Sequence, residues 1–230
     1  MAIFALIPAA GSGSRLRAAT PKQYVPLAGR PLLWHAVRAV CVPQVSAVFV
    51  VLAANDEHFA RQDWSAFGAK LNPLYCGGGT RRDSVLNGLA AVSGTVEADD
   101  WMLVHDAARP CLPAADLRKL LDEGLADAIG AILALPVAET VKRAGKDEGG
   151  VQRIAATEDR AQLWLAQTPQ LFRLGLLLQA LSHSANATDE AAAVEALGLM
   201  PRLVLGSREN LKVTFPEDVV IAAAILAGRA

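Results

Sequence analysis

The sequence is poor in aromatic residues and cysteines, and it has no excess of either charge. Of its 230 residues, 5% are aromatic and three are cysteines (Cys41, Cys76 and Cys111), and the formal net charge at pH 7 is −1. Without a basic excess there is no overall field to attract nucleic acid, so any anion site must be local. An odd number of widely spaced cysteines gives no disulfide framework and fits a reducing compartment. The lack of a basic excess therefore predicts no nucleic-acid partner, and the cysteines predict no disulfide framework.

Long apolar runs and metal-ligand clusters are missing as well. No stretch approaches the ~20 apolar residues of a membrane helix. The apolar segment from Ala2 to Ala10 lacks the basic residues of a signal peptide. The four histidines have no cysteine or second histidine at zinc-ligand spacing, and no Gly-x-Ser-x-Gly elbow indicates a hydrolase. We expect a cytoplasmic protein with no membrane partner and no zinc.

The composition, with 53% hydrophobic and 20% charged residues, is typical of a globular protein. We expect a single domain that spans residues 1–230. Apolar runs alternate with helical patterns, which predicts an α/β fold with a mostly parallel sheet between helices. The predicted strands are Ile3–Ile7, Ala47–Leu52, Asn72–Tyr75, Trp101–Val104, Gly130–Leu135 and Leu203–Leu205. The predicted helices start at Pro31, near Asp56, at Thr80 and at Pro113, and later ones span Arg173–Leu181, Asp189–Leu197 and Pro216–Leu226.

The segment 136–157 interrupts this alternation. Two short alternating stretches flank a polar, glycine-rich tip around Gly145 and Gly149-Gly150, which indicates a protruding β-hairpin arm. A lone hairpin is marginally stable and usually packs on something else, so we interpret it as a dimerisation arm. A disordered surface loop is the alternative.

A glycine-rich segment, Pro-Ala-Ala-Gly-Ser-Gly-Ser-Arg-Leu at 8–16, follows the first predicted strand. Its glycines allow backbone N–H groups to approach phosphate oxygens closely, and Arg15 and Lys22 add two cations, which suits a polyphosphate. It is not a P-loop, and Leu16 stands where a dinucleotide fingerprint needs its third glycine. The segment indicates a nucleotide-triphosphate loop of another kind. The residues alone are also compatible with a flexible loop whose arginine and lysine are solvated.

Two other segments also follow predicted strands. Gly77-Gly78-Gly79 opens a helix at Thr80, where main-chain groups and the Ser84 hydroxyl could contact a base, although an ordinary capped turn would look the same. Asp106 comes just after a strand, where a carboxylate can hold Mg²⁺ or a ribose hydroxyl, or simply cap a turn. Because ligands bind at the carboxyl ends of parallel strands, we expect all three segments to converge.

Several ordered motifs identify a resemblance that covers nearly the whole chain. Besides the segment at 8–16 and Pro-Lys-Gln at 21–23, they are GGGTRRDSV at 77–85, VHDAARP at 104–110, AQTPQ at 166–170, TDEA at 188–191 and NLKVT at 210–214. Together they resemble the 2-C-methyl-D-erythritol 4-phosphate cytidylyltransferase family of the non-mevalonate isoprenoid pathway. The resemblance implies a Rossmann-like nucleotidyltransferase domain that transfers CMP from CTP to this phosphorylated polyol, releases pyrophosphate, and uses Mg²⁺ or another divalent cation.

The resemblance also implies roles for individual residues. Arg15 and Lys22 would stabilise the transition state, and Lys212 and Arg160 would position the substrate phosphate. In the family the arm embraces a second subunit, so the resemblance implies a homodimer in which Arg160 and Thr140 reach the partner's site. Asp106 would contact substrate hydroxyls near the metal. The implied nucleotide- and substrate-binding residues are Pro8, Ala9, Ala10, Gly11, Gly13, Gly78, Gly79, Ser84, Asp106, Ala107, Arg109, Thr140 and Thr188.

Two details refine this expectation. Gly79 departs from the family pattern, in which many members carry a polar side chain, so a side-chain contact to ribose is not expected there. The substrate phosphate is itself the nucleophile and is largely dianionic near neutrality, because its second pKa is about 6. The reaction then needs cations and backbone donors but no general base, and we interpret His105 as structural.

Three alternatives remain from the sequence. A cytidylyltransferase for another phosphorylated polyol, such as ribitol 5-phosphate, would share the glycine-rich loop. A non-catalytic nucleotide-binding module would keep that loop but have no reason to keep Arg15, Lys22, Asp106, Arg160 and Lys212 together. A nicotinamide-binding protein is the weakest option because of Leu16.

Overall fold

The computed structural model describes residues 1–11, 20–146 and 149–229. Its centre is a seven-stranded sheet in the order β11-β7-β10-β6-β1-β4-β5. The strands are β1 (Ile3–Pro8), β4 (Val45–Val51), β5 (Leu71–Leu74), β6 (Trp101–Val104), β7 (Gly130–Pro136), β10 (Trp164–Arg173) and β11 (Arg202–Leu205). Only β10 runs antiparallel to its neighbours, β6 and β7, among the described strands of this sheet. The predicted mostly parallel α/β fold is confirmed.

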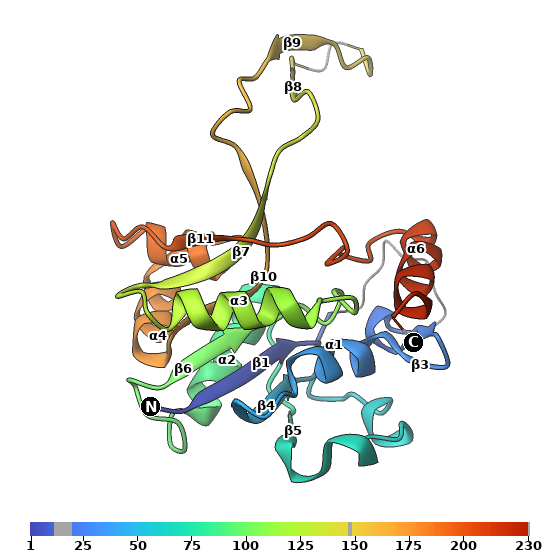
Figure 1. Cartoon of the computed structure of the whole chain (residues 1–230), viewed down its shortest axis with the longest axis vertical. Coiled ribbons are helices and arrows are strands. Elements are labelled where there is room, and N and C mark those ends of the chain that lie inside the picture. The colour runs from blue at the N-terminus through green and yellow to red at the C-terminus, as the bar shows by residue number, and fades with distance from the viewer. Residues whose placement is uncertain (12–19, 147–148, 230) are drawn as a thin grey trace.

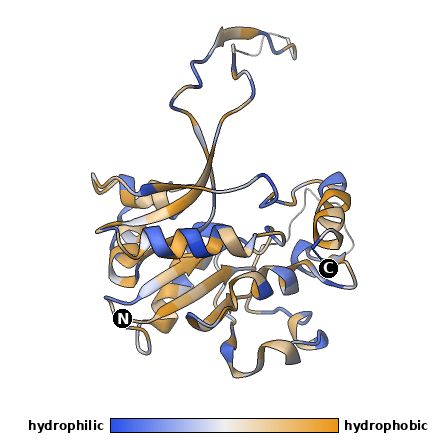
Figure 2. Cartoon of the chain, viewed as in Figure 1, coloured by the Kyte–Doolittle hydropathy of each residue, from blue (hydrophilic) through white to orange (hydrophobic). Residues whose placement is uncertain are grey.

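The central strand β1 shows why the sheet lies inside the molecule. Ala5, Leu6 and Ile7 are fully buried, so both faces of β1 are covered, as is usual for parallel strands. Figure 2 shows β1 and β7 in hydrophobic colours, whereas α3 carries both hydrophilic and hydrophobic residues.

Helices cover the two faces of the sheet (Figure 1). On one face, α1 (Leu32–Val40) and α3 (Ala114–Gly124) pack into a cluster with Ala5 and Ile7. On the other face, α2 (Arg81–Val92), α4 (Leu174–His183) and α5 (Glu190–Glu195) pack around Leu6. In α3 the buried residues Leu117, Leu120 and Leu121 recur at the three- and four-residue spacing of one helix face, so this helix presents a single apolar stripe to the sheet.

A third, smaller cluster closes one end of the molecule. The last helix, α6 (Pro216–Ala227), packs Ala222 against Leu27 and Leu32, next to the short pair β2 (Pro26–Leu27) and β3 (Arg30–Pro31). The 3-10 turn η2 (Lys22–Tyr24) precedes this pair. None of the described helices is long and apolar enough to cross a membrane.

The protruding hairpin arm is also confirmed. It extends away from the sheet between β7 and β10 (Figure 1), and β8 (Lys142–Ala144) pairs antiparallel with β9 (Ile154–Thr157) near its tip.

Two parts of the fold differ from the sequence prediction. The helix predicted near Asp56 is wrong: the segment forms only the 3-10 turns η3 (Phe59–Arg61) and η4 (Ser65–Lys70). The Asp56 carboxylate accepts hydrogen bonds from the backbone of His58 and Phe59, which favours a turn, and Gly68 interrupts η4 with a φ of 53°. Strand β10 was missed because Pro169, in its middle, has no N–H to donate, and the pairing of β10 with β7 shifts between Ala166 and Gln170.

Candidate active site

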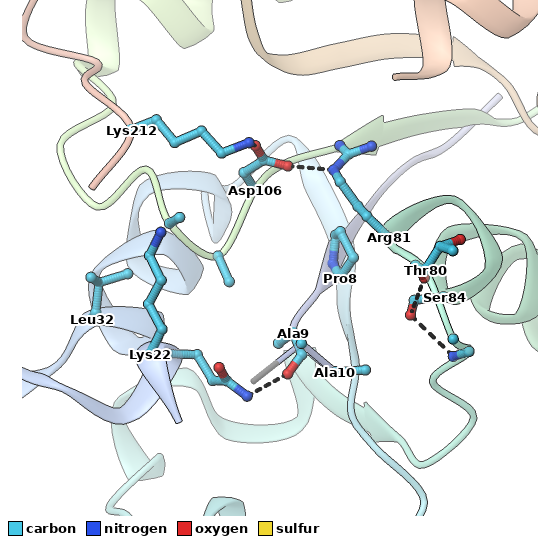
Figure 3. Close-up of a pocket in the computed structure, with 16 residues that line it drawn as sticks. Pro8, Ala9, Ala10, Lys22, Leu32, Thr80, Arg81, Ser84, Asp106 and Lys212 are labelled. Atoms are coloured by element: carbon cyan, nitrogen blue, oxygen red, sulfur yellow. Dashed lines mark hydrogen bonds and ion pairs between the residues drawn. The ribbon is translucent and has the colours of Figure 1, made fainter. Parts of the chain in front are cut away.

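A cavity of about 530 Å³ opens at the carboxyl ends of β1, β5 and β6. The three segments expected to converge do so: the end of β1, the Gly77 loop and the segment after β6 all line it. Figure 3 shows Lys22 and Leu32 on one side, Arg81 and Ser84 from α2 on the other, and Asp106 with Lys212 above. The lining residues are Pro8, Ala9, Ala10, Gly11, Lys22, Gln23, Leu32, Gly78, Gly79, Thr80, Arg81, Ser84, Asp106, Ala107, Ala108 and Lys212.

Ala10, at the start of the first glycine-rich segment, lies directly against the Gly77 loop beside this cavity. A Cβ added at Gly77 would lie 2.3 Å from the Cβ of Ala10 and 2.8 Å from the carbonyl oxygen of Leu52. The backbone N–H of Gly77 donates to that same Leu52 oxygen over 2.8 Å. Only glycine permits this approach, so the Gly77 loop packs tightly against Ala10 and the chain just after β4.

The turn that carries Lys22 is tied to the same glycine-rich segment. The side-chain amide of Gln23 donates to the carbonyl oxygen of Ala9 over 2.6 Å, and both groups are buried. On the other side of Gln23, the Tyr24 hydroxyl donates to the Asp56 carboxylate at 2.8 and 2.9 Å. The backbone of Lys22 is therefore held next to Ala9, and its side chain enters the cavity (Figure 3).

The N-terminus of α2 forms the opposite wall. The Thr80 hydroxyl accepts from the backbone N–H of Asp83 (3.1 Å) and caps the helix. The Ser84 hydroxyl donates to the carbonyl of Thr80 (2.9 Å) and accepts from the N–H of Gly78 (3.1 Å). Through these two bonds Ser84 shapes the loop that lines the cavity, and its hydroxyl keeps one acceptor lone pair for the predicted base contact.

Four alternating charges form a connected group that begins at the top of the cavity and ends at buried Glu190. Arg81 Nε donates to Asp106 Oδ1 (2.7 Å), and Lys212 Nζ lies 2.7 Å from Asp106 Oδ2. The other two guanidinium nitrogens of Arg81 donate to the two carboxylate oxygens of Glu190, at 2.8 and 3.1 Å. Two cations and two carboxylates thus form a connected group of no net charge.

This group fixes the ionisation of Asp106. Burial by itself raises the pKa of this carboxyl, but the positive charges of Arg81 and Lys212 and their hydrogen bonds outweigh burial and hold the pKa well below its usual range. Asp106 is therefore a carboxylate at any physiological pH. Its two partners differ in exposure: the side chain of Arg81 is 27% exposed and that of Lys212 is 41% exposed.

Hydrogen bonds of the residues on both sides of Lys212 set the position of its backbone. Two residues earlier, buried Asn210 donates its side-chain amide to the carbonyl of Thr168 (2.8 Å). One residue later, the N–H of Val213 donates to the carbonyl of Ala108 (2.8 Å). Arg109, predicted to bind substrate, donates from its guanidinium to the carbonyl of Asn210 (2.6 Å) and holds this segment against the loop after β6.

A second, smaller cavity of about 210 Å³ adjoins the first and shares three of its residues, Arg81, Asp106 and Lys212. Thr188, predicted to bind nucleotide or substrate, lines this cavity, and so does Arg109. Its remaining lining residues are Ala166, Gln167, Thr168, Gln170 and Asp189. The charged group around Asp106 therefore lies at the junction of two cavities.

His105 lies behind Asp106 and does not line either cavity. It is fully buried, its Nε2 lies 3.0 Å from the carbonyl of Arg109, and its Nδ1 lies 3.2 Å from the Thr168 hydroxyl. That hydroxyl accepts from the N–H of Asp106, which leaves its own proton to donate to Nδ1. Burial lowers the pKa of His105 to about 4. A neutral ring that donates from Nε2 satisfies both neighbours, in keeping with a structural role.

Some predicted site residues are not brought together within the chain. Thr140 and Arg160 lie between β7 and β10, in or next to the arm, are exposed, and line neither cavity. Arg160 donates to the carbonyl of Ala138, also in the arm. Arg15 and Gly13 lie outside the described residues, so their predicted roles stay predictions.

Two residues of the charged group, Arg81 and Glu190, received no role in the sequence analysis. One signal was available for Arg81, because a cation in the first turn of a helix opposes the helix dipole and so suggests another purpose. The sequence held no such signal for Glu190, because a glutamate after an aspartate N-cap is ordinary in a first helical turn.

The donors fit a divalent cation only in part. Among the described residues, no group of three or more histidine, cysteine, aspartate or glutamate side chains could hold a metal. Asp106 is the single carboxylate among the described residues that line the larger cavity. One carboxylate suits Mg²⁺ that is held mainly by substrate phosphates and water, which is how this ion usually binds in phosphoryl-transfer sites.

Comparison with known proteins shows the family of the chain. The family model described as 2-C-methyl-D-erythritol 4-phosphate cytidylyltransferase (IspD) matches residues 3–228. A protein of that name from Aromatoleum aromaticum is 53% identical over 98% of this chain and 96% of its own length. Another, from Nitrosospira multiformis, is 54% identical over 97% of both chains.

Solved structures give the same result. A crystal structure of a 4-diphosphocytidyl-2C-methyl-D-erythritol synthase is 40% identical, with a TM-score of 0.85 and 98% of each chain covered. That of the 2-C-methyl-D-erythritol 4-phosphate cytidylyltransferase from Thermus thermophilus is 30% identical, with a TM-score of 0.78 over 99% of this chain and all of its own. The chain therefore belongs to the 2-C-methyl-D-erythritol 4-phosphate cytidylyltransferase family of nucleotidyltransferases.

Proposed function

We propose that the chain catalyses its family's reaction, the transfer of CMP from CTP to 2-C-methyl-D-erythritol 4-phosphate with release of pyrophosphate, as a step of isoprenoid precursor synthesis. The observation that carries this proposal is the pair of adjoining cavities that share Arg81, Asp106 and Lys212. A transferase needs two substrates to meet, and the shared residues mark the point where they would.

The larger cavity suits the nucleotide. Its floor is the backbone of two glycine-rich loops, which can approach a base and phosphates closely, and it contains Lys22. Pro8, Ala9, Ala10, Gly11, Gly78, Gly79 and Ala107 would contact CTP there through main-chain groups or close packing. The smaller cavity, lined by Asp106 and the exposed hydroxyl-bearing residue Thr188, suits the hydroxyls of a short polyol.

The chemistry then follows from the charges. The polyol phosphate is largely dianionic near neutrality and attacks the α-phosphorus of CTP, which forms a new P–O bond as the bond to pyrophosphate breaks. No proton has to be removed from this nucleophile. Negative charge gathers on the α-phosphate and on the leaving pyrophosphate, and fixed cations in a confined cavity stabilise it. Lys22 and Lys212 would serve in this way, with Arg15 as the third cation proposed from the sequence.

A divalent cation completes the proposal. Mg²⁺ would be held by the triphosphate, with Asp106 as the protein carboxylate nearest to it, and would neutralise phosphate charge and hold the triphosphate in one conformation. For Asp106 to contribute an oxygen, Lys212 must turn from Oδ2 towards a substrate phosphate, which its partial exposure allows.

We also propose that the chain works as a homodimer through its arm. Apolar side chains in the arm and at its base are exposed in the single chain, among them Val151 (53%), Ile154 (68%) and Leu165 (55%). Exposed apolar groups on a thin hairpin gain stability by packing against another surface. In the dimer, Thr140 and Arg160 would contact the substrate in the partner's site. Three free cysteines agree with a cytoplasmic location, which is part of the same proposal.

Pyrophosphate release from the purified chain tests the proposal. The assay crosses CTP, UTP, ATP and GTP with 2-C-methyl-D-erythritol 4-phosphate and ribitol 5-phosphate, each with Mg²⁺ and with EDTA. We expect turnover only with CTP, the methylerythritol phosphate and metal. Turnover with ribitol 5-phosphate instead would keep the chemistry but change the substrate, and CTP binding without any turnover would favour a binding module. Full activity in EDTA would contradict the role of the metal.

A further inference from the structure

The side chain of Glu190, at the start of α5, is buried completely and pairs with the partly buried charge of Arg81. Its carboxylate has no exposed surface, and both of its oxygens accept from Arg81, at 2.8 and 3.1 Å. Two parallel hydrogen bonds of this kind fix the plane of a guanidinium as well as its position. Arg81 and Glu190 are 109 residues apart in sequence, so this pair joins the first turn of α2 to the first turn of α5.

The backbone around Glu190 is itself held firmly. Asp189 caps α5 by accepting from the N–H of Ala192 (2.9 Å), and its other oxygen accepts from the side-chain amide of Gln170 (2.9 Å). The oxygen of that same amide group accepts from the N–H of Ala191 (2.8 Å). Bonds on both sides of Glu190 thus anchor the start of α5 to strand β10.

Because Glu190 occupies two nitrogens of Arg81, the third nitrogen, Nε, is directed to Asp106 Oδ1. The two oxygens of Asp106 then differ. Oδ1 has a partner that is itself clamped, whereas Oδ2 has Lys212, whose side chain is 41% exposed and not clamped by a second carboxylate among the described residues. Lys212 is therefore the partner that an incoming phosphate can draw away from Asp106, which leaves Oδ2 open to a metal or a hydroxyl.

We propose that Glu190 is a positioning residue for the reaction: by clamping Arg81 it holds Asp106 in one orientation, with Oδ1 fixed and Oδ2 exchangeable. Without the clamp, the Arg81 guanidinium is free to turn and pair with both oxygens of Asp106. Oδ2 would then no longer be available to a substrate hydroxyl or to the metal. This inference rests on the proposed function, since it assumes that Asp106 lies between the two substrates.

The inference separates catalysis from nucleotide binding. The floor of the nucleotide cavity, made by Ala9, Ala10 and Gly78, does not contact Glu190 in any described hydrogen bond or ion pair. Loss of the clamp should therefore change the alignment of the reacting groups more than the affinity for CTP. Misplacement of groups by about 1 Å is enough to lower turnover ~100-fold.

Two variants of Glu190 provide the test. Glu190→Gln removes the charge, and Glu190→Asp keeps the charge to compensate Arg81 but is one methylene too short for the same clamp. We measure kcat and KM for both substrates, the Kd of CTP by titration calorimetry, and the melting temperature. For both variants we expect kcat to fall by roughly tenfold to a hundredfold, with the Kd of CTP changed by less than about threefold. Glu190→Asp should melt close to the unaltered chain, and it carries the test alone if Glu190→Gln does not fold.

Arg82 offers a matched control in the same helical turn. It too joins α2 to a neighbouring helix, because it donates to carbonyls of Leu181 and Ser184 at the end of α4, but it lines neither cavity. Arg82→Gln should lower the melting temperature while kcat of the folded protein stays within about twofold.

The outcomes distinguish the positioning inference for Glu190 from the proposed function. If Glu190→Asp keeps its stability and also its kcat, Glu190 is only structural and the positioning inference is wrong. An equal loss of kcat in Arg82→Gln would lead to the same conclusion. If the unaltered chain itself gives no turnover with CTP and 2-C-methyl-D-erythritol 4-phosphate, the proposed function has failed.

Discussion

At the scale of single residues, the site depends on how buried charges are compensated. Asp106 is buried but has a cation on each oxygen, and Glu190 is buried with Arg81 on both of its oxygens. Removing one member of such a group leaves another charge unpaired, which costs more than the pair contributes. For each substitution in this group, kcat and the free energy of unfolding should therefore both be measured.

Lys212 is the member of this group best suited to a separate test. Lys212→Ala removes a partly exposed cation, so the chain should still fold, but the charge that develops on the phosphates loses one of its counterions. We expect kcat to fall by about 100-fold to 1,000-fold. Lys119 is a partly exposed lysine on α3 outside both cavities, so Lys119→Ala should leave kcat unchanged. A Lys212→Ala chain with normal turnover would exclude Lys212 from the mechanism.

His105 makes stability depend on pH. Its pKa is about 4 in the folded chain and near 6.5 when unfolded, so below pH 6.5 the unfolded chain binds a proton that the folded chain does not. The contribution to stability is complete above pH 6.5 and is lost as the pH falls towards 4. By about pH 5 the free energy of unfolding should drop by on the order of 2 kcal/mol from this residue.

Urea denaturation at about pH 7.5 and pH 5 measures this effect, with His105→Gln as the comparison. Burial lowers the pKa of His35 as well, so the unaltered chain should lose somewhat more than His105 alone contributes. Glutamine does not titrate, so His105→Gln should show a clearly smaller loss of stability over the same interval. Equal pH dependence in the two chains would mean that His105 is not buried as a neutral ring.

At the scale of elements, loops at the ends of parallel strands make the nucleotide cavity. Gly77→Ala tests how closely two of them must approach. The added Cβ would overlap Ala10 and the carbonyl of Leu52 and force the loops apart, so we expect KM for CTP to rise by roughly tenfold or more, with a loss of about 1–3 kcal/mol in stability. At Gly94, a Cβ meets no atom within 4 Å, and Gly94→Ala should leave KM unchanged. An unchanged KM in Gly77→Ala would show that the loops can separate without harm to the site.

The same elements show how far the sequence alone could go. Apolar runs such as Ile3–Ile7 and Trp101–Val104 predicted their strands, because β-strands buried on both faces need continuous apolar sequence. Strand β10 was not predicted, because Pro169 interrupts the strand pattern. The motifs located the residues that line the cavities, but not the contacts between them. The pairing of Arg81 with Glu190 joins helices far apart in sequence, and only the packed fold brings them together.

At the scale of the whole molecule, one chain provides two adjoining cavities, and the arm extends away from the body (Figure 1). We expect light scattering after size-exclusion chromatography to give twice the chain mass of 24.2 kDa. Ile154 is the most exposed of the larger apolar side chains in the arm. Ile154→Asp places a charge there and should shift the chain towards monomer. It should also lower kcat, because Thr140 and Arg160 would be lost from the partner's site. Met200→Ser, at an exposed apolar position on the body, should remain dimeric. A monomeric unaltered chain at high concentration would contradict the dimer.

The central claim is that the polyol phosphate attacks the α-phosphorus of CTP where the two cavities meet. The most direct test is turnover of CTP with 2-C-methyl-D-erythritol 4-phosphate that carries ¹⁸O in its phosphate, followed by ³¹P NMR and mass spectrometry of both products. The account predicts ¹⁸O in the diphosphate bridge of a cytidine diphosphate product, with unlabelled pyrophosphate in equal amount. Labelled pyrophosphate, or CTP cleaved to CMP without a joined product, would contradict it.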